Sequence, residues 1–310
     1  MSARSTAPQR LFVGGTGRCG THAMGSLLGR HSRYRRIHTE LRFHADPPGL
    51  PGLLRGEVEL AEFLATLRGR WWKRTASQGF ESGLFKRVPE EIFERAIAEF
   101  ERDFPDDQWG AASRLVYGLL DPIAAQAKKP GWVEMSNRNV EASPVLLELV
   151  PDIKMIHMIR DGRDASSSVV AQKWGPDEIM AAIAWWERRV ADDERSSSQL
   201  PEERLLIVCF EDFVTGDREG TYDRLLDFIG ERRLFRGRRE PEMRRFFDEE
   251  IGTGRANIER WRKGLSEAEQ DELCERYAAA LERLIAADTP ARPLFERSLQ
   301  ALVGPVPAPA

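Results

Sequence analysis

Two segments of the chain combine a short apolar run with residues that can bind an anion. In the first, the run Leu11–Gly14 leads into a glycine-rich turn, and a helical pattern begins at Thr21. Such a turn points several backbone N–H groups at one place, beside the positive end of a helix dipole. It therefore favours a phosphate or sulfate ligand, although a tight strand–helix turn without a ligand needs the same glycines.

The position of the positive charge in this turn differs from that in ATP-binding loops of the form GxxxxGK[ST]. Gly15 and Gly20 have the required separation, but Thr21 stands where the lysine would be, and Arg18 lies inside the turn. A loop lysine reaches the β- and γ-phosphates, and the hydroxyl that follows it binds Mg²⁺. A cation inside the turn favours a shorter donor that carries one phosphate and one sulfate.

The second segment is Met158–Val170, where a strand pattern again leads into a helical one. Arg160 ends the predicted strand, and Ser168 follows in the opening turns of the helix. An arginine and a serine hydroxyl can together hold a second anion. The alternative is that Asp164 or Ser166 only caps the helix, while Arg160 pairs with Asp161 or Asp164 on the surface.

Short apolar runs alternate with amphipathic runs along the chain, which predicts an α/β fold with a three-layer parallel sheet and right-handed crossovers. The predicted strands are Leu11–Gly14, Ile37–Glu40, Lys154–Arg160 and Leu205–Phe210. The predicted helices are Thr21–Arg30, Glu57–Arg70, Glu90–Glu101, Ala111–Lys128, Glu178–Ser196, Tyr222–Ile229 and one from about Asp164. The predicted loops are His31–Arg36 and Asp46–Gly56.

Composition narrows the class of protein. The 310 residues carry a net charge of −4, whereas proteins that coat nucleic acid are usually basic, so we expect no nucleic-acid partner. No apolar run of ~18 residues could span a membrane, and the N-terminus lacks the apolar centre of a signal peptide. Cys19, Cys209 and Cys274 are too few for a disulfide scaffold and fit a cytoplasmic protein. No Cys/His cluster has metal-ligand spacing, so no metal is expected.

We expect a single domain over residues 1–310, in which 1–10 and 303–310 are disordered. Residues 41–130 form a mostly helical insertion on the acceptor side. The alternative is two loosely joined halves that divide near Pro130.

The two anion-binding segments together resemble the motifs of the PAPS-dependent sulfotransferase family, particularly its bacterial and tyrosylprotein-like branches (PAPS is 3′-phosphoadenosine 5′-phosphosulfate). Gly17–Thr21 is similar to the first family motif, and Arg160 with Ser168 eight positions later is similar to the second. Further similar segments are Trp132–Asn139, Phe210–Asp212 and Gly252–Trp261. The chain departs from the family pattern in having Cys19, His22, Ala23 and Met135 where serine, threonine, tryptophan and lysine are common.

The resemblance implies a P-loop-NTPase-like topology with helical insertions. It also implies metal-free transfer of a sulfuryl group from PAPS to a hydroxyl, or less readily an amine, of a small-molecule, carbohydrate or peptide acceptor. The 5′-phosphosulfate would be held by Gly17, Arg18, Cys19, Gly20, Thr21 and His22. The 3′-phosphate would be held by Arg160 and Ser168. Arg255 would close over that phosphate, or would be a plain surface arginine.

Transfer also needs a base for the acceptor proton and a cation for the departing phosphate. The resemblance assigns the first role to Glu40, with His38 and His44 as alternatives, and Arg18 supplies the second. We expect Trp71, Trp72 and the helices through Tyr117 to shape the acceptor pocket, with the alternative that the aromatic side chains there belong to the core. His157 in its apolar strand is interpreted as structural. Two other functions remain open: a P-loop small-molecule kinase and a non-catalytic nucleotide-binding module on the same fold.

Overall fold

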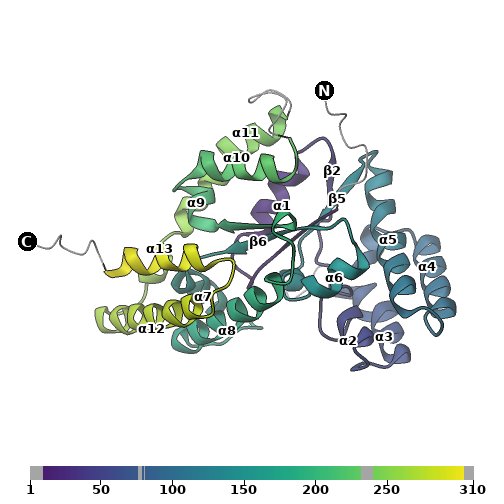
Figure 1. Cartoon of the computed structure of the whole chain (residues 1–310), viewed down its shortest axis with the longest axis horizontal. Helices are drawn as coiled ribbons and strands as arrows, with labels where there is room; N and C mark the ends of the chain where they lie inside the picture. The colour runs from purple at the N-terminus through teal and green to yellow at the C-terminus, as the bar shows by residue number, and fades with distance from the viewer. Residues whose placement is uncertain (1–9, 76–78, 80, 232–239, 304–310) are drawn as a thin grey trace, which may run out of the picture.

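The computed structural model describes residues 10–75, 79, 81–231 and 240–303 (Figure 1). Its centre is a sheet of five parallel strands in the order β2-β5-β1-β6-β7. The strands are β1 (Arg10–Gly14), β2 (Tyr34–Arg36), β5 (Gly131–Glu134), β6 (Lys154–Ile159) and β7 (Leu205–Cys209). This arrangement confirms the predicted α/β class with a parallel sheet.

Helices cover both faces of the sheet, so the molecule has three layers (Figure 1). Because successive strand residues point to opposite faces, Leu11 and Val13 of β1 pack on one helical layer and Phe12 on the other. The first layer contains α1 (Thr21–Gly29), α9 (Phe210–Val214), α10 (Arg218–Phe228) and α11 (Pro241–Glu249). The opposite layer contains α5 (Gln108–Gln126), α6 (Ser143–Leu149), α7 (Gly162–Val170) and α8 (Ile179–Ser197).

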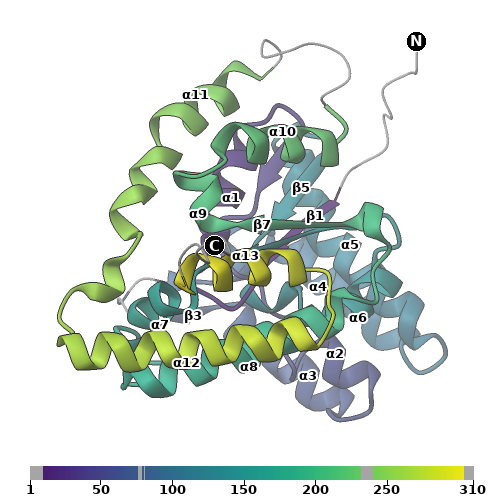
Figure 2. The same cartoon turned by 60° about the vertical axis from the view of Figure 1, so that its left-hand side comes forward.

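Two C-terminal helices complete the structure beside α8. Figure 2 shows the long helix α12 (Glu267–Ala286) lying along α8, with α13 (Arg292–Val303) next to it. The buried side chains that join these helices include Trp186 of α8, Tyr277 of α12 and Phe295 of α13.

The chain between β2 and β5 is mostly helical and packs on the sheet through α5. Its other elements are α2 (Leu50–Leu54), α3 (Leu60–Thr66), α4 (Glu90–Asp103) and a short hairpin of β3 (Arg74–Thr75) and β4 (Glu81–Ser82). Leu119 and Leu120 of α5 are fully buried in the core that this segment shares with Phe12 and Trp132 of the sheet.

The structure corrects two predictions near the first crossover. The strand is Tyr34–Arg36 rather than Ile37–Glu40, because Tyr34–Arg36 pairs with Gly131–Val133 of β5. Pairing ends where the backbone N–H of Ile37 donates to the Val133 carbonyl at 2.9 Å, and the chain then leaves the sheet. The predicted loop Asp46–Gly56 contains α2, because Leu50 and Leu53 are buried and a proline in the first turn of a helix needs no N–H partner.

The start of the chain differs from the sequence prediction at Arg10, which begins β1. Its guanidinium binds Asp121 at 2.7 Å and Asp152 at 2.9 Å and lies over the ring of Tyr117. These contacts hold the strand's first residue. The other residues expected to be disordered, 1–9 and 304–310, lie outside the described residues, and Val303 ends α13.

The helices predicted at 90–101, 111–128 and 178–196 are observed as α4, α5 and α8 with ends shifted by a few residues. α3 is shorter than its prediction, because the backbone at Gly69 leaves the helical region at φ −92° and ψ −108°.

Strand register matters most for function. Gly14 lies opposite His157 of β6 and Phe12 opposite Glu134 of β5, so the glycine-rich turn and the segments after β5 and β6 meet at one edge of the sheet.

Candidate functional site

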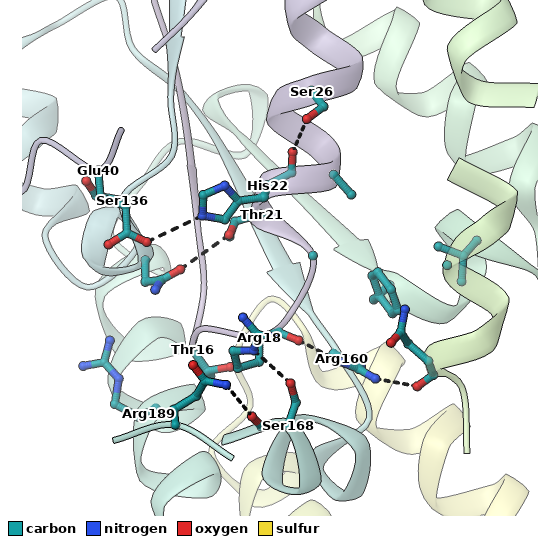
Figure 3. A pocket seen from close by; sticks show the side chains of 18 of the residues that line it. Thr16, Arg18, Thr21, His22, Ser26, Glu40, Ser136, Arg160, Ser168 and Arg189 are labelled. Atoms are coloured by element: carbon teal, nitrogen blue, oxygen red, sulfur yellow. Dashed lines mark hydrogen bonds and ion pairs between the residues drawn. The ribbon is translucent and has the colours of Figure 1, made fainter. Parts of the chain in front are cut away.

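A cavity of about 820 Å³ lies at the carboxyl edge of the sheet. Part of its lining comes from the glycine-rich turn and the start of α1, through Arg18, Gly20, Thr21 and His22. Other predicted site residues reach it from distant parts of the sequence: Glu40, Arg160 and Ser168. Figure 3 shows these side chains facing a common space.

The glycine-rich turn adopts a backbone that few residues other than glycine can take. Gly15, Gly17 and Gly20 have φ angles of 146°, 92° and 95°. A Cβ on Gly15 would lie 2.3 Å from the Met158 carbonyl oxygen of β6, so a side chain there would displace a strand. The N–H of Gly15 is already used, since it donates to the Asn137 carbonyl at 3.0 Å.

Arg160 fastens the turn to the end of β6. Its guanidinium donates to the carbonyl of Arg18 at 2.9 Å and to the carbonyl of Asn257 at 2.5 Å. Arg18 has a positive φ of 59°, and the bond from Arg160 stabilises this left-handed conformation. Arg160 is almost fully buried, and burial lowers the pKa of its guanidinium, although the carboxylate of Asp164 opposes that shift.

Arg18 and Ser168 are in direct contact. The Nε of Arg18 donates to the hydroxyl of Ser168 at 2.8 Å (Figure 3). The three residues predicted from separate motifs, Arg18, Arg160 and Ser168, therefore form one polar group at the mouth of the turn.

Glu40 lies on the other side of the turn, near the start of α1. Its carboxylate is 26% exposed and its Oε1 is 3.8 Å from the Nε2 of His22. The backbone carbonyl of Glu40 accepts a hydrogen bond from Arg74 at 2.9 Å, which holds this stretch of chain in place. The carboxylate thus faces the same cavity as Arg18 while remaining open to solvent.

The two histidines considered as alternative bases do not line the cavity. His38 lies on the surface outside the cavity lining. Its ring is nevertheless partly desolvated, and this desolvation together with nearby arginines lowers its pKa to about 4. His44 is fully buried under the cavity wall. His157 is also buried, with its Nδ1 3.0 Å from Glu194, in keeping with a structural role.

Several predicted residues are not brought to the cavity surface. Gly17 lies between Asn137 and Trp174, and the Cys19 side chain points beneath the turn toward Gly15. Burial raises the pKa of the Cys19 thiol to about 11, so the thiol stays protonated at neutral pH. Arg255 is exposed and outside the cavity lining. The expected acceptor side chains Trp71, Trp72 and Tyr117 pack elsewhere in the helical segment or beside Arg10.

Residues that the sequence interpretation did not assign complete the lining. Ser136, Asn137 and Arg138 follow β5, and the parallel register could have placed them at this edge. The other unassigned lining residues include Trp174, Trp185, Arg189 and Phe210. Trp174 lies in the turn between α7 and α8, and Trp185 and Arg189 lie on α8. No short motif marks their position.

A buried carboxylate holds two walls of the cavity together. Glu134, at the end of β5, accepts hydrogen bonds from the backbone N–H and hydroxyl of Ser136 at 2.8 and 2.7 Å and from Asn139 at 2.7 Å. It also lies 3.2 Å from the His44 ring and accepts from the backbone N–H of Leu41 at 3.3 Å. Although burial raises the pKa of this carboxyl, His44 and the hydrogen bonds outweigh burial and lower the pKa to about 2.

Within the described residues, no group of three or more His, Cys, Asp and Glu side chains could hold a metal ion. The three cysteines are all free. A search of the same residues for a helix long and apolar enough to cross a membrane finds none.

The parallel sheet, the glycine-rich turn after its central strand and the cations at its edge define an α/β protein with a polar cavity at the carboxyl edge of its sheet. A model of the sulfotransferase family matches residues 8–236, and the chain therefore belongs to the sulfotransferase family. No curated protein matches the chain.

Two of the solved structures to which the chain is similar carry the name sulfotransferase. Sulfotransferase STF9 from Mycobacterium avium is 16% identical, with 89% of this chain and 77% of that chain covered and a TM-score of 0.47. The sulfotransferase domain of the Synechococcus PCC 7002 olefin synthase is also 16% identical, with 90% and 98% covered and a TM-score of 0.46.

We predict that Glu134→Gln destabilises the protein in a pH-dependent way. A carboxyl pKa of about 2 in place of 4.5 corresponds to ~3 kcal/mol of unfolding free energy. Because the folded-state pKa is depressed, this stability is present above pH 4.5 and is lost as the pH falls toward 2. Urea unfolding from pH 8 to about pH 2.5 measures the difference from wild type across this window, with exposed Glu148→Gln as the control. A difference that stays constant below pH 4.5 would contradict the prediction.

Proposed function

We propose that this protein transfers a sulfuryl group from PAPS to a hydroxyl, or less readily an amine, of an acceptor. The observation that carries the proposal is the meeting of Arg18, Arg160 and Ser168 at the glycine-rich turn, in a cavity that also contains Glu40. Membership of the sulfotransferase family supports the same reaction.

The 5′-phosphosulfate of the donor would bind at the turn and the N-terminus of α1. The first turn of α1 has no acidic residue, and no side chain caps its N-terminus. The first backbone N–H groups of the helix are therefore available to an anion, with the positive end of the helix dipole behind them. The hydroxyl of Thr21 and the guanidinium of Arg18 lie beside this place.

The 3′-phosphate would bind at Arg160 and Ser168. A phosphate there would compete with Arg18 for the Ser168 hydroxyl, since the two side chains are 2.8 Å apart. Arg18 would then turn toward the oxygen that joins the phosphate to the sulfate. Donor binding would thereby place the cation where negative charge develops during transfer.

The adenine would lie against the apolar side of the cavity, which is formed by Phe210, Val214, Phe246 and Ile251. Phe210 packs against Gly20, where a Cβ would approach its ring to 2.4 Å, and the Arg160 guanidinium lies 5.0 Å from the centre of that ring. This cleft offers a purine a flat surface on the side of α1 where Ala23 replaces the common tryptophan.

In the proposed reaction the acceptor oxygen attacks sulfur while its proton passes to the carboxylate of Glu40. The bond between sulfur and the bridging oxygen breaks, and its electron pair stays on the departing 5′-phosphate. Arg18 and the backbone N–H groups of the turn stabilise that charge. The products are the sulfated acceptor and 3′-phosphoadenosine 5′-phosphate (PAP), and no step requires a metal ion.

A binding and transfer assay tests the reaction class. We expect calorimetry to give at least tenfold tighter binding of PAP than of ATP, because Thr21 replaces the lysine that ATP-binding loops use. Transfer from labelled PAPS to an acceptor library should continue in excess EDTA. Transfer of phosphate from ATP in place of PAPS, abolished by EDTA and restored by Mg²⁺, would support a kinase. PAP binding without transfer to any acceptor would support a non-catalytic module.

The role of the 3′-phosphate residues is tested with two ligands. Ser168→Ala and Arg160→Ala should weaken PAP binding, by roughly ten- to a hundredfold for the arginine, because a charged hydrogen bond is worth about 1.5–3 kcal/mol. Adenosine 5′-phosphosulfate lacks the 3′-phosphate, so its affinity should change little in Ser168→Ala. In Arg160→Ala it should fall by less than the affinity for PAP, because this variant also loses the bond to the Arg18 carbonyl that holds the turn. Calorimetry on both ligands measures this, with exposed Ser198→Ala as the control. Equal losses for the two ligands would show that these residues do not bind the 3′-phosphate.

The role of Glu40 as base is tested by Glu40→Gln. A positioned base contributes ~10²–10⁴-fold to the rate, so turnover should fall by that factor while PAP affinity stays within a few-fold of wild type. Steady-state kinetics and calorimetry separate the two effects, with exposed Glu59→Gln as the control. Near-normal turnover of Glu40→Gln would exclude this carboxylate as the base.

A further inference from the structure

One wall of the cavity presents an open aromatic surface. Trp174, in the turn between α7 and α8, is 56% exposed, and its ring reaches within 3.5 Å of the place that a Cβ on Gly17 would take. Among the described residues, Trp109 at 44% is the other exposed large apolar side chain, and it lies far from the cavity at the start of α5. Trp174 therefore exposes a large apolar face directly beside the proposed sulfate site.

The partly buried ring of Trp185 supports Trp174. The two ring centres are 5.9 Å apart at an angle of 52°, so Trp185 contacts one side of Trp174 and leaves much of the other side open. Tryptophan offers a large, rigid contact surface at low entropic cost, which suits a ring-shaped ligand. A single exposed aromatic is common on protein surfaces, so the neighbouring charges must decide whether this is a binding surface.

Two arginines lie on the same wall and share one carboxylate. Arg138 donates to both oxygens of Glu141 at 2.7 Å, and Arg189 donates to one of them. Glu141 lies outside the cavity lining, whereas both arginines are part of it. Among the described residues, no other hydrogen-bond partner is found for either guanidinium. Asp193 and Asp192 also attract the charge of Arg189, but within the described chain no hydrogen bond joins either of them to its guanidinium. N–H groups therefore remain available on a pair of side chains that Glu141 holds in place.

The neighbouring cation and the proposed donor site leave the N–H groups of this arginine pair to another ligand. Arg42, the other cation on this side, is neutralised by Asp46 at 2.9 Å. Figure 3 shows Arg189 on the far side of Thr16 and Arg18 from Arg160, so the proposed donor phosphates lie elsewhere in the cavity. Paired guanidinium groups bind carboxylate, phosphate or sulfate through charged hydrogen bonds.

We propose that the acceptor is a hydroxylated ring that carries an anionic group. The ring lies on Trp174, the anion binds Arg138 and Arg189, and the hydroxyl is presented to Glu40. This inference rests on the proposed function, and it names the class of acceptor for that same site.

The test measures binding to protein saturated with PAP. The anionic probes are 4-hydroxyphenylacetate, for an aromatic ring, and methyl β-glucuronide, for a sugar ring. The matched neutral compounds are 4-methylphenol and methyl β-glucoside. Calorimetry should show saturable binding of at least one anionic probe, at least tenfold tighter than its neutral counterpart. The probe that binds identifies the kind of ring.

The variants separate the anion contact from the ring contact. Arg138→Gln and Arg189→Gln should each weaken binding of the anionic probe by about tenfold or more and leave binding of its neutral counterpart nearly unchanged. Trp174→Ala should weaken binding of both the anionic probe and its neutral counterpart. The matched controls are Arg195→Gln, an exposed arginine on α8, and Trp109→Ala, and both should behave as wild type.

PAP binding by each protein is measured first and shows whether the donor site is intact. Failure of the wild type to bind PAP would overturn the proposed function and this inference with it. Normal PAP binding, with no saturable binding of either anionic probe or with equal binding of the neutral compounds, would overturn the acceptor inference alone.

Discussion

The cavity depends on a single buried interaction, the carboxylate of Glu134 at the end of β5. Its two oxygens gather donors from Ser136, Asn139 and Leu41, together with the ring of His44. Asn139 in turn donates to the Val13 carbonyl of β1. The strand that precedes the glycine-rich turn, the loop that carries Glu40 and the loop that carries Arg138 are therefore tied to one buried negative charge. A buried charge is stable only when its partners are all present, so these three segments must adopt one relative position.

This frame separates the two sides of the proposed reaction. On the donor side, the turn and Arg160 depend on backbone atoms: Arg160 donates to two carbonyl groups, and Gly15 allows no side chain against β6. On the acceptor side, the lining consists of side chains that project from loops and from α8. The proposed donor site is thus built from the sheet edge itself, and the proposed acceptor site is added around it.

The sequence predicted the parts of the site that follow strands and failed for those that depend on longer connections. Arg18, Arg160 and Ser168 could be proposed because each lies within a few residues of a buried strand or of the turn after it, and parallel strands bring such positions together. Trp174 and Arg189 could not, because their positions depend on how α8 returns across the sheet. Arg255 was grouped with the site by resemblance, yet its side chain lies outside the cavity, and Trp71 and Trp72 were read as pocket residues although their ring surfaces pack into the helical segment.

The fit of Gly15 against β6 has a consequence for how the protein can diversify. A mutation at Gly15 or Gly20 meets backbone or a packed ring within 2.4 Å, so the turn tolerates almost no variation. Trp174, Arg138 and Arg189 touch neither of those positions, and exchanging them alters a surface without moving a strand. If the proposed roles hold, new acceptor preferences can therefore arise by point substitution while the proposed donor-binding edge is inherited unchanged.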